Sequence, residues 1–315
     1  MSDQAFERAG LIFADEVRRA GEDPRRLRDG VRQGLFVRVR RGAYCTRVRW
    51  DSLSNRERHV LAVRAVVRDT APPFLVAGRS AAAVYGMPFC AFWPERVTLL
   101  VPWRGGGSSE PGIARTTNSA ASARADSFDG IPITTRDRTV LDVAREAGHA
   151  NAVALLDWAQ SRRRKTPLKR ESVEAELRRS DFTRGRRAAS AAFAFSTHLS
   201  DSPGESLARV AIHRLGFEVP QLQVEFTDSQ GAMYPDFYWP SIRVAAEFDG
   251  KVKYTRDEFT GGDPAEVVWK EKQREDRLRR QVARVDRIVS ADVADPRRLA
   301  RILTDAGVPR GSVRR

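Results

Sequence analysis

Residues 234–254 decide the fold of the C-terminal part and read YPDFYWPSIRVAAEFDGKVKY. Asp236 begins one apolar run, and the returning run, residues 242–248, is rich in β-forming residues. Because side chains alternate across a strand, we expect Glu247 and Asp249 on one face. Two carboxylates on a half-buried strand repel each other unless a cation neutralises them. The stretch therefore predicts a β-hairpin that ends in a metal site.

Other charged residues surround this hairpin in a fixed order. Glu205 precedes it, a Pro-Asp step ends at Asp236, and Glu247 lies on the returning strand. This order resembles the small restriction-endonuclease-like domains related to very-short-patch-repair nucleases, whose pattern is written PD-(D/E)xK. The resemblance covers roughly residues 201–305. The position where that pattern usually has lysine holds Asp249 instead, and lysines follow later.

The resemblance implies an αβββαβ core and metal-dependent hydrolysis of phosphodiester bonds. Mg²⁺ or Mn²⁺ suits a site of carboxylates, and such an ion activates water and neutralises phosphate charge. A lysine near the water would be Lys253, with Lys251 as second choice, and Lys272 and Asp276 would flank the site from the next helix. The residues expected at the catalytic centre are Glu205, Asp236, Glu247, Asp249, Lys253 and Lys272, with Asp236, Glu247 and Asp249 as the metal ligands.

The first fifty residues change from helical to strand periodicity. Leu11, Ile12 and Val17 mark a first amphipathic helix that ends at Gly21, and a second helix runs from Pro24 to about Gly34. Residues 36–44 then alternate as a two-stranded ribbon with a turn at Arg41-Gly42. This order predicts a winged helix-turn-helix.

Two short steps in this segment, Gly34-Leu35-Phe36 and Arg41-Gly42-Ala43-Tyr44, resemble the N-terminal domain of antitoxins of the abortive-infection type. The match covers about residues 5–47. It implies that the second helix enters the major groove of duplex DNA while the wing follows the backbone. The alternative is a solvated arginine face on a small helical subdomain. The expected DNA contacts are Arg25, Arg28, Arg32, Arg38, Arg40 and Arg41.

Charge is distributed unevenly along the 315 residues. The formal net charge is +14, yet residues 201–315 hold 20 basic and 19 acidic side chains, so residues 1–200 hold 35 and 22. A basic field attracts polyanions, of which nucleic acid is the commonest in cytoplasm, although an arginine-rich composition also follows from a GC-rich genome.

Other features of the composition narrow the class of protein. No apolar run approaches the roughly 18 residues of a membrane span, and the N-terminus lacks a secretory pattern. We therefore expect a cytoplasmic, nucleoid-associated protein without a membrane partner. Cys45 and Cys90 are too few and too isolated for a disulfide framework or a zinc cluster, so we expect them to serve as small apolar side chains.

The whole pattern is that of an α+β multidomain protein. The expected segments are a winged helix-turn-helix at 1–50, an α+β antitoxin-like region at 51–148, a helical basic linker at 149–200 and an endonuclease-like domain at 201–315. Ser54 predicts a capping box, and Ser80 predicts a helix cap. The basic runs 162–165 and 184–187 are either solvated surface or phosphate contacts.

Three functions fit this organisation. The leading hypothesis is a DNA-binding protein with a metal-dependent endonuclease-like domain. The second is an antitoxin-type transcriptional regulator whose nuclease fold is catalytically inactive, with a cognate toxin as partner. The third is an RNA-acting protein, because charge alone does not distinguish the two polymers.

Overall fold

The computed structural model describes residues 10–88, 93–102, 110–117, 123–182, 184–250 and 264–311. The chain divides into two compact units. The first contains Met1–Glu146 and Arg170–Arg187, and the second contains Ala147–Lys169 and Ala188–Arg315. Each unit combines helices with β-sheet, which confirms the expectation of an α+β protein with several sheets.

The first unit begins with a small antiparallel sheet of order β1-β3-β2. Sequence periodicity was misleading here, because the stretch expected as one helix begins as strand β1. Leu11 and Phe13 face one apolar cluster while Ile12 faces another, which is strand alternation. The elements are β1 (Ile12–Phe13), α1 (Ala14–Arg19), α2 (Arg25–Arg32), β2 (Phe36–Arg40), β3 (Ala43–Thr46) and α3 (Arg47–Ser52).

The rest of this unit is built on a five-stranded sheet of order β6-β5-β4-β8-β7. Ser54 and Glu57 form the expected capping box of α4. Ser80 is not a cap, because its helix begins at Gly78 and its hydroxyl lies inside the core, 2.9 Å from His59 Nε2. The elements are α4 (Asn55–Asp69), β4 (Leu75–Val76), α5 (Gly78–Val84), β5 (Val97–Leu100), β6 (Ile113–Thr116), β7 (Ala125–Phe128), β8 (Ile131–Thr134) and α6 (Arg136–Ala144).

The segment expected as a helical linker contributes to both units. Helices α7 (His149–Gln160), α8 (Arg170–Arg179) and α9 (Arg186–Phe195) occupy it. Helix α8 packs on α6 in the first unit, whereas α7 packs on α10 (Pro203–Arg214) in the second. The buried Asp157–Arg209 ion pair, with 2.9 Å between Oδ2 and Nη2, joins α7 to α10.

The second unit is organised around a four-stranded sheet of order β14-β13-β12-β9. Residues 219–226 do not form one continuous strand. They split at Gln223, whose φ of +50° interrupts the extended backbone, so that β9 pairs with β12 and β10 pairs with β11. The strands are β9 (Gln221–Leu222), β10 (Phe226–Asp228), β11 (Gly231–Met233), β12 (Phe237–Trp239), β13 (Val244–Asp249) and β14 (Arg284–Val289).

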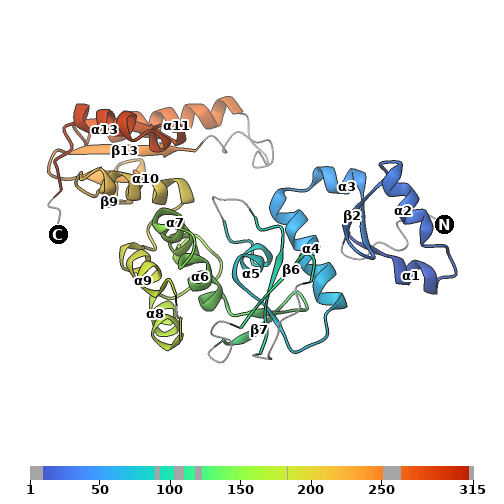
Figure 1. The fold of residues 1–315 in the computed structure, drawn as a ribbon. Helices are drawn as coiled ribbons and strands as arrows, with labels where there is room; N and C mark the ends of the chain where they lie inside the picture. Colours follow the sequence, from blue (N-terminus) through green and yellow to red (C-terminus); the bar gives the residue numbers. More distant parts are fainter. Residues whose placement is uncertain are drawn as a thin grey trace. The chain divides into compact units, whose positions relative to one another are not determined.

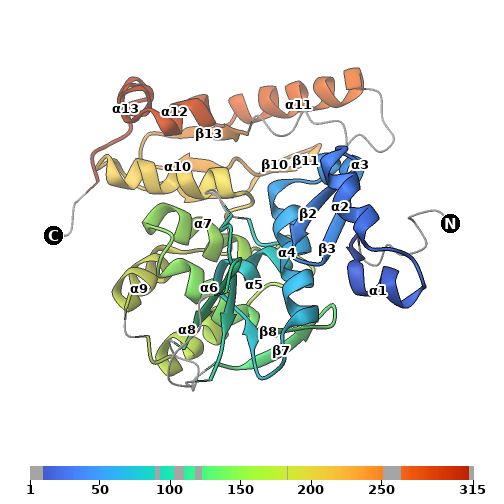
Figure 2. The same ribbon diagram turned by 45° about the vertical axis from the view of Figure 1, so that its right-hand side comes forward.

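Helices cover both faces of this sheet. Val244, Ala246 and Phe248 pack with α10, whereas Ala245 packs with Leu278 of α11 (Pro264–Arg279). Figures 1 and 2 show α10 and α11 on opposite sides of β13. Strands β13 and β14 are parallel and are connected through α11. Helices α12 (Ser290–Ala294) and α13 (Pro296–Asp305) complete the unit, and Leu299 and Leu303 of α13 join the α10 core.

Candidate functional site

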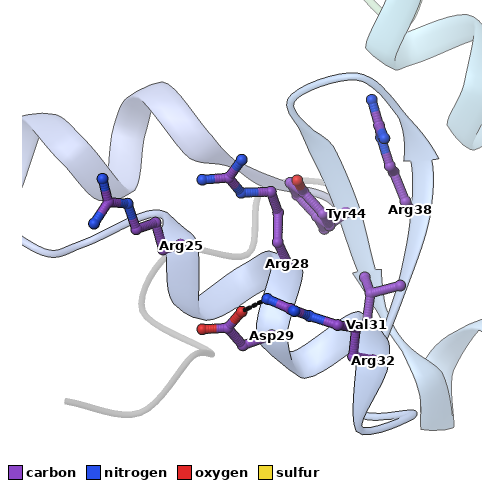
Figure 3. A pocket seen from close by; sticks show the side chains of 7 residues that line it. All are labelled: Arg25, Arg28, Asp29, Val31, Arg32, Arg38 and Tyr44. Atoms are coloured by element: carbon purple, nitrogen blue, oxygen red, sulfur yellow. Dashed lines mark hydrogen bonds and ion pairs between the residues drawn. The ribbon is translucent and has the colours of Figure 1, made fainter.

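Helix α2 lies very close to strand β2. A Cβ atom at Gly30 would come within 2.4 Å of the Phe36 ring, so only glycine permits this approach. Beside this contact is a cavity of about 550 Å³ that the helix and the ribbon line together. Figure 3 shows its lining residues, which are Arg25, Arg28, Asp29, Val31, Arg32, Arg38 and Tyr44.

The arginines of this cavity differ in their partners. Arg25, Arg28 and Arg38 are exposed, and within the described part of the chain none has an acidic side chain at ion-pair distance. Arg32 is instead paired with Asp29, one turn earlier on α2. The surface therefore presents cationic side chains around the buried Tyr44, which is chemistry suited to phosphate groups. We call Arg25, Arg28, Arg32 and Arg38 the arginine surface.

Arg40 and Arg41 lie apart from this surface. The pairing of β2 with β3 shifts between Arg38 and Arg40, so the expected alternation fails there. The side chains of Arg38 and Arg40 therefore lie on opposite faces of the ribbon. Arg40 Nη2 is 3.1 Å from Glu110 Oε1, and its other nitrogen approaches Asp69. Arg41 is exposed in the turn of the ribbon and does not line the cavity.

Asp236 lies immediately before β12 and is held by the neighbouring backbone. Its Oδ2 accepts a 2.8 Å hydrogen bond from the Phe248 backbone N–H, and its Oδ1 accepts one of 3.1 Å from Gln223 Nε2. The Phe248 bond places the Asp236 carboxylate at the same end of the sheet as Glu247. Strand pairing, which the sequence predicted, produces this proximity.

Glu205 reaches the same region from the first turn of α10. It is 7% exposed, and its Oε2 accepts a 2.8 Å hydrogen bond from the Asp201 backbone N–H. Burial, and next the negative charge of Asp236, raise the pKa of Glu205 to about 7. The structure therefore brings Glu205 and Asp236 together, as the sequence pattern implied. A Cβ on Gly204 would lie 2.1 Å from the Phe248 ring, so a glycine also permits this helix to approach.

Glu247 and Asp249 share a face of β13, as strand alternation predicted, but each is beside an arginine. Arg274 Nη2 of α11 lies 2.5 Å from Glu247 Oε1. Arg287 Nη1 of β14 lies 3.6 Å from Asp249 Oδ2. Neither arginine was among the expected site residues. Both arginines lie near these carboxylates because the chain crosses over from β13 through α11 to the parallel strand β14.

The expected lysines do not join this arrangement in the described residues. Lys272 is exposed, and it lies two residues, or about 200° around the helix, from the Arg274 that contacts Glu247. Lys251 and Lys253 lie outside the described residues.

The residues present fit a divalent cation only in part. Within the described residues, no group of three acidic, histidine or cysteine side chains converges closely enough to hold a metal ion. Glu247 and Asp249 already have cationic partners. Glu205 and Asp236, in contrast, are two carboxyl groups whose repulsion a bound cation would relieve, and Mg²⁺ commonly uses only one or two carboxylates plus water.

No family model matches the chain. The uncharacterized proteins MT2308 and Rv2248 of Mycobacterium tuberculosis are each 29% identical over 197 residues, covering 60% of this chain and 70% of each relative. The crystal structure of the Rv2827c protein from Mycobacterium tuberculosis aligns with a TM-score of 0.37 and 17% identity, over 64% of this chain and 76% of that one. Among the described helices, none is both long and apolar enough to cross a membrane.

Proposed function

We propose that this protein binds duplex DNA through the arginine surface of a winged helix-turn-helix. The observation that carries the proposal is the cavity between α2 and β2, where three exposed arginines surround Tyr44 without acidic partners in the described chain. Side chains on one helix and on the adjoining ribbon can contact a phosphate backbone and base edges together. Arg28 and Arg25 lie three residues apart, so they project from one face of α2.

The proposal is tested with the full chain and a fluorescent duplex, by measuring affinity as a function of salt. Replacing Arg25, Arg28 and Arg38 together with alanine should weaken binding by about 100-fold or more and reduce the slope of log affinity against log salt by about 2–3. Arg301→Ala, an exposed arginine of α13, is the matched control. Unchanged affinity and slope in the triple variant would refute DNA binding by this surface.

Hydrolysis of DNA phosphodiester bonds is a second candidate function, and the Glu205–Asp236 pair favours it. A carboxyl group with a pKa near neutral beside a second carboxyl group is typical of acid–base chemistry. If Mg²⁺ or Mn²⁺ binds there, Asp236 and Glu205 would hold it, and the ion would supply charge neutralisation and a water of lowered pKa. Asp236 would remain oriented by Phe248 N–H and Gln223, while Arg274 neutralises Glu247.

The regulator hypothesis is favoured by the two arginine pairs. With Glu247 and Asp249 neutralised by Arg274 and Arg287, this end of the sheet can bind without cleaving. Incubation of plasmid and duplex DNA with Mg²⁺ or Mn²⁺ separates the two functions. Nicking by the wild type that is lost in Asp236→Asn and Glu205→Gln supports the endonuclease. Tight DNA binding with no cleavage supports the antitoxin-type regulator, whose cognate toxin would then be the partner to seek.

A further inference from the structure

We infer that the basic loop after α7, residues 162–165, is a second DNA contact that binds backbone phosphates beside the Glu205–Asp236 pair. This inference rests on the proposed function, since it assumes that duplex DNA is the ligand. The loop lies outside the segment that resembles a nuclease. Its sequence is Arg162-Arg163-Arg164-Lys165. Four consecutive cations repel one another, and a bound polyanion or the solvent reduces this repulsion.

The loop is joined to the carboxyl pair by a short chain of contacts. Arg163 Nη2 lies 2.5 Å from Asp201 Oδ2, and the Asp201 backbone N–H donates to Glu205 Oε2 at 2.8 Å. Glu205 in turn experiences the charge of Asp236. The cationic loop therefore lies beside the acidic pair within the second unit.

The loop is also held in one conformation before any ligand binds. The Arg162 backbone N–H donates to His198 O, that of Arg164 donates to Ser161 O, and that of Leu168 donates to Ala159 O. Arg164 lies over the Trp158 ring, 3.4 Å from its centroid, and so anchors the loop by its side chain. A fixed backbone lowers the entropic cost of ordering the exposed cations on a ligand.

The cations of the loop divide into anchored and available groups. Arg162 and Lys165 are exposed and have no acidic side chain at ion-pair distance within the described residues. The Arg163 side chain is 68% exposed although it is paired with Asp201, whose side chain is only 7% exposed. Because the Arg163 end of this pair is exposed, a phosphate can approach it and compete with the Asp201 carboxylate for it. Asp201 then acts as an internal competitor with DNA.

This competition predicts opposite changes in DNA affinity for two variants. In the full chain, Arg162→Ala with Arg163→Ala should weaken binding of a fluorescent DNA duplex by about tenfold and lower the salt slope by about 1–2. Asp201→Asn should strengthen binding by about two- to fivefold, because it removes the carboxylate that competes for Arg163. A purely structural role for the Arg163–Asp201 pair predicts weaker binding or no change in both variants. Arg301→Ala is the control.

The same measurements in the background of the Arg25, Arg28 and Arg38 triple variant separate this inference from the proposed function. Loss of affinity from the loop variant in both backgrounds supports the loop as an independent contact, even if the arginine surface proves inactive. No change in either background, with unaltered thermal unfolding, overturns the loop while leaving the arginine surface intact. A loop effect seen with an RNA duplex but not with DNA would overturn the choice of DNA.

Discussion

At the scale of single residues, an irregularity of one residue in β2 decides which arginines face the cavity. The shift in pairing near Val39 sends Arg38 to the cavity and Arg40 toward Glu110. Neighbouring arginines of one strand therefore have different partners. The sequence predicted the ribbon but not the shift, because the residues around Val39 contain no glycine or other signal of a bulge.

This difference predicts opposite effects of two similar substitutions. Arg38→Ala should weaken binding of duplex DNA by about tenfold with little change in stability, since Arg38 has no acidic partner in the described chain. Arg40→Ala should leave binding within about twofold and lower the free energy of unfolding by about 1 kcal/mol. Fluorescence anisotropy and urea unfolding measure both. Equal losses of affinity would contradict the assignment.

His59 is a second residue whose environment has a measurable consequence. Its ring lies in the core, with Nε2 2.9 Å from Ser80 Oγ, and burial lowers its pKa to about 4. The unfolded pKa is near 6.5, so the neutral ring stabilises the fold fully above that value. That contribution is lost as the pH falls from 6.5 through 4, because the unfolded chain then takes up the proton first.

The wild type should therefore lose on the order of 3 kcal/mol more than a His59→Gln variant between pH 7.5 and pH 4. Urea unfolding of the first unit at several pH values is the measurement. His59→Gln should be the less stable protein at neutral pH, and the gap should narrow in acid. A gap that is constant with pH would show that the pKa of His59 is the same in the folded and the unfolded chain.

At the scale of elements, the α7–α10 contact depends on one buried ion pair. Asp157 is fully buried, Arg209 is 6% exposed at its side chain, and Asp157 also accepts a hydrogen bond from Thr197 N. Burial raises the pKa of Asp157 while Arg209 opposes that rise. Removing one partner leaves the other charge buried without compensation, and that cost exceeds the value of the intact pair.

Arg209→Leu should accordingly lower the free energy of unfolding of the second unit by about 3–5 kcal/mol. Arg209→Leu combined with Asp157→Leu should recover much of the loss, since neither charge then remains. Thermal and urea unfolding of all variants, with Arg301→Ala as an exposed control, provide the check. If the double variant is as unstable as the single one, packing rather than charge holds the two helices together.

The elements of the carboxylate site were predictable to different degrees. Strand alternation predicted a shared face for Glu247 and Asp249, and the resemblance to the nuclease-like domains implied that Glu205 and Asp236 share a site. The first depends on local pattern alone, whereas the second also depends on how α10 packs on the sheet. Arg274 was missed because it reaches Glu247 only through the parallel crossover, and its position depends on the rotation of α11. Periodicity around Lys272 does not specify that rotation.

At the scale of the whole molecule, the chain does not divide at one point. The sequence placed a boundary near residue 201, but α7 belongs with α10 and its successors, while α8 belongs with the first unit. The helix cap Ser202 and the following Pro203 favoured a boundary there, and in the structure they mark the start of α10. Which unit a helix joins depends on tertiary contacts between distant residues, which no local signal records.

Two fragments of the chain test whether α7 stabilises the second unit. Residues 201–315 lack α7, so Arg209 would lose Asp157 and the face of α10 would be uncovered. We expect this fragment to aggregate or unfold at a temperature at least about 10 °C below that of residues 147–315. Size-exclusion chromatography and circular dichroism measure this difference. Equal stability would show that α7 adds nothing to the second unit.

The assignment of α7 to the second unit and α8 to the first also determines the order in which the units can fold during translation. The first unit cannot acquire α8 until residue 187 has been synthesised, and by then α7 has already emerged. Domains usually complete their folding one after another during translation. In this chain the first unit stays incomplete until α8 is available, and during that interval α7 of the second unit is exposed without its partner. A chaperone can bind the exposed helix during that interval.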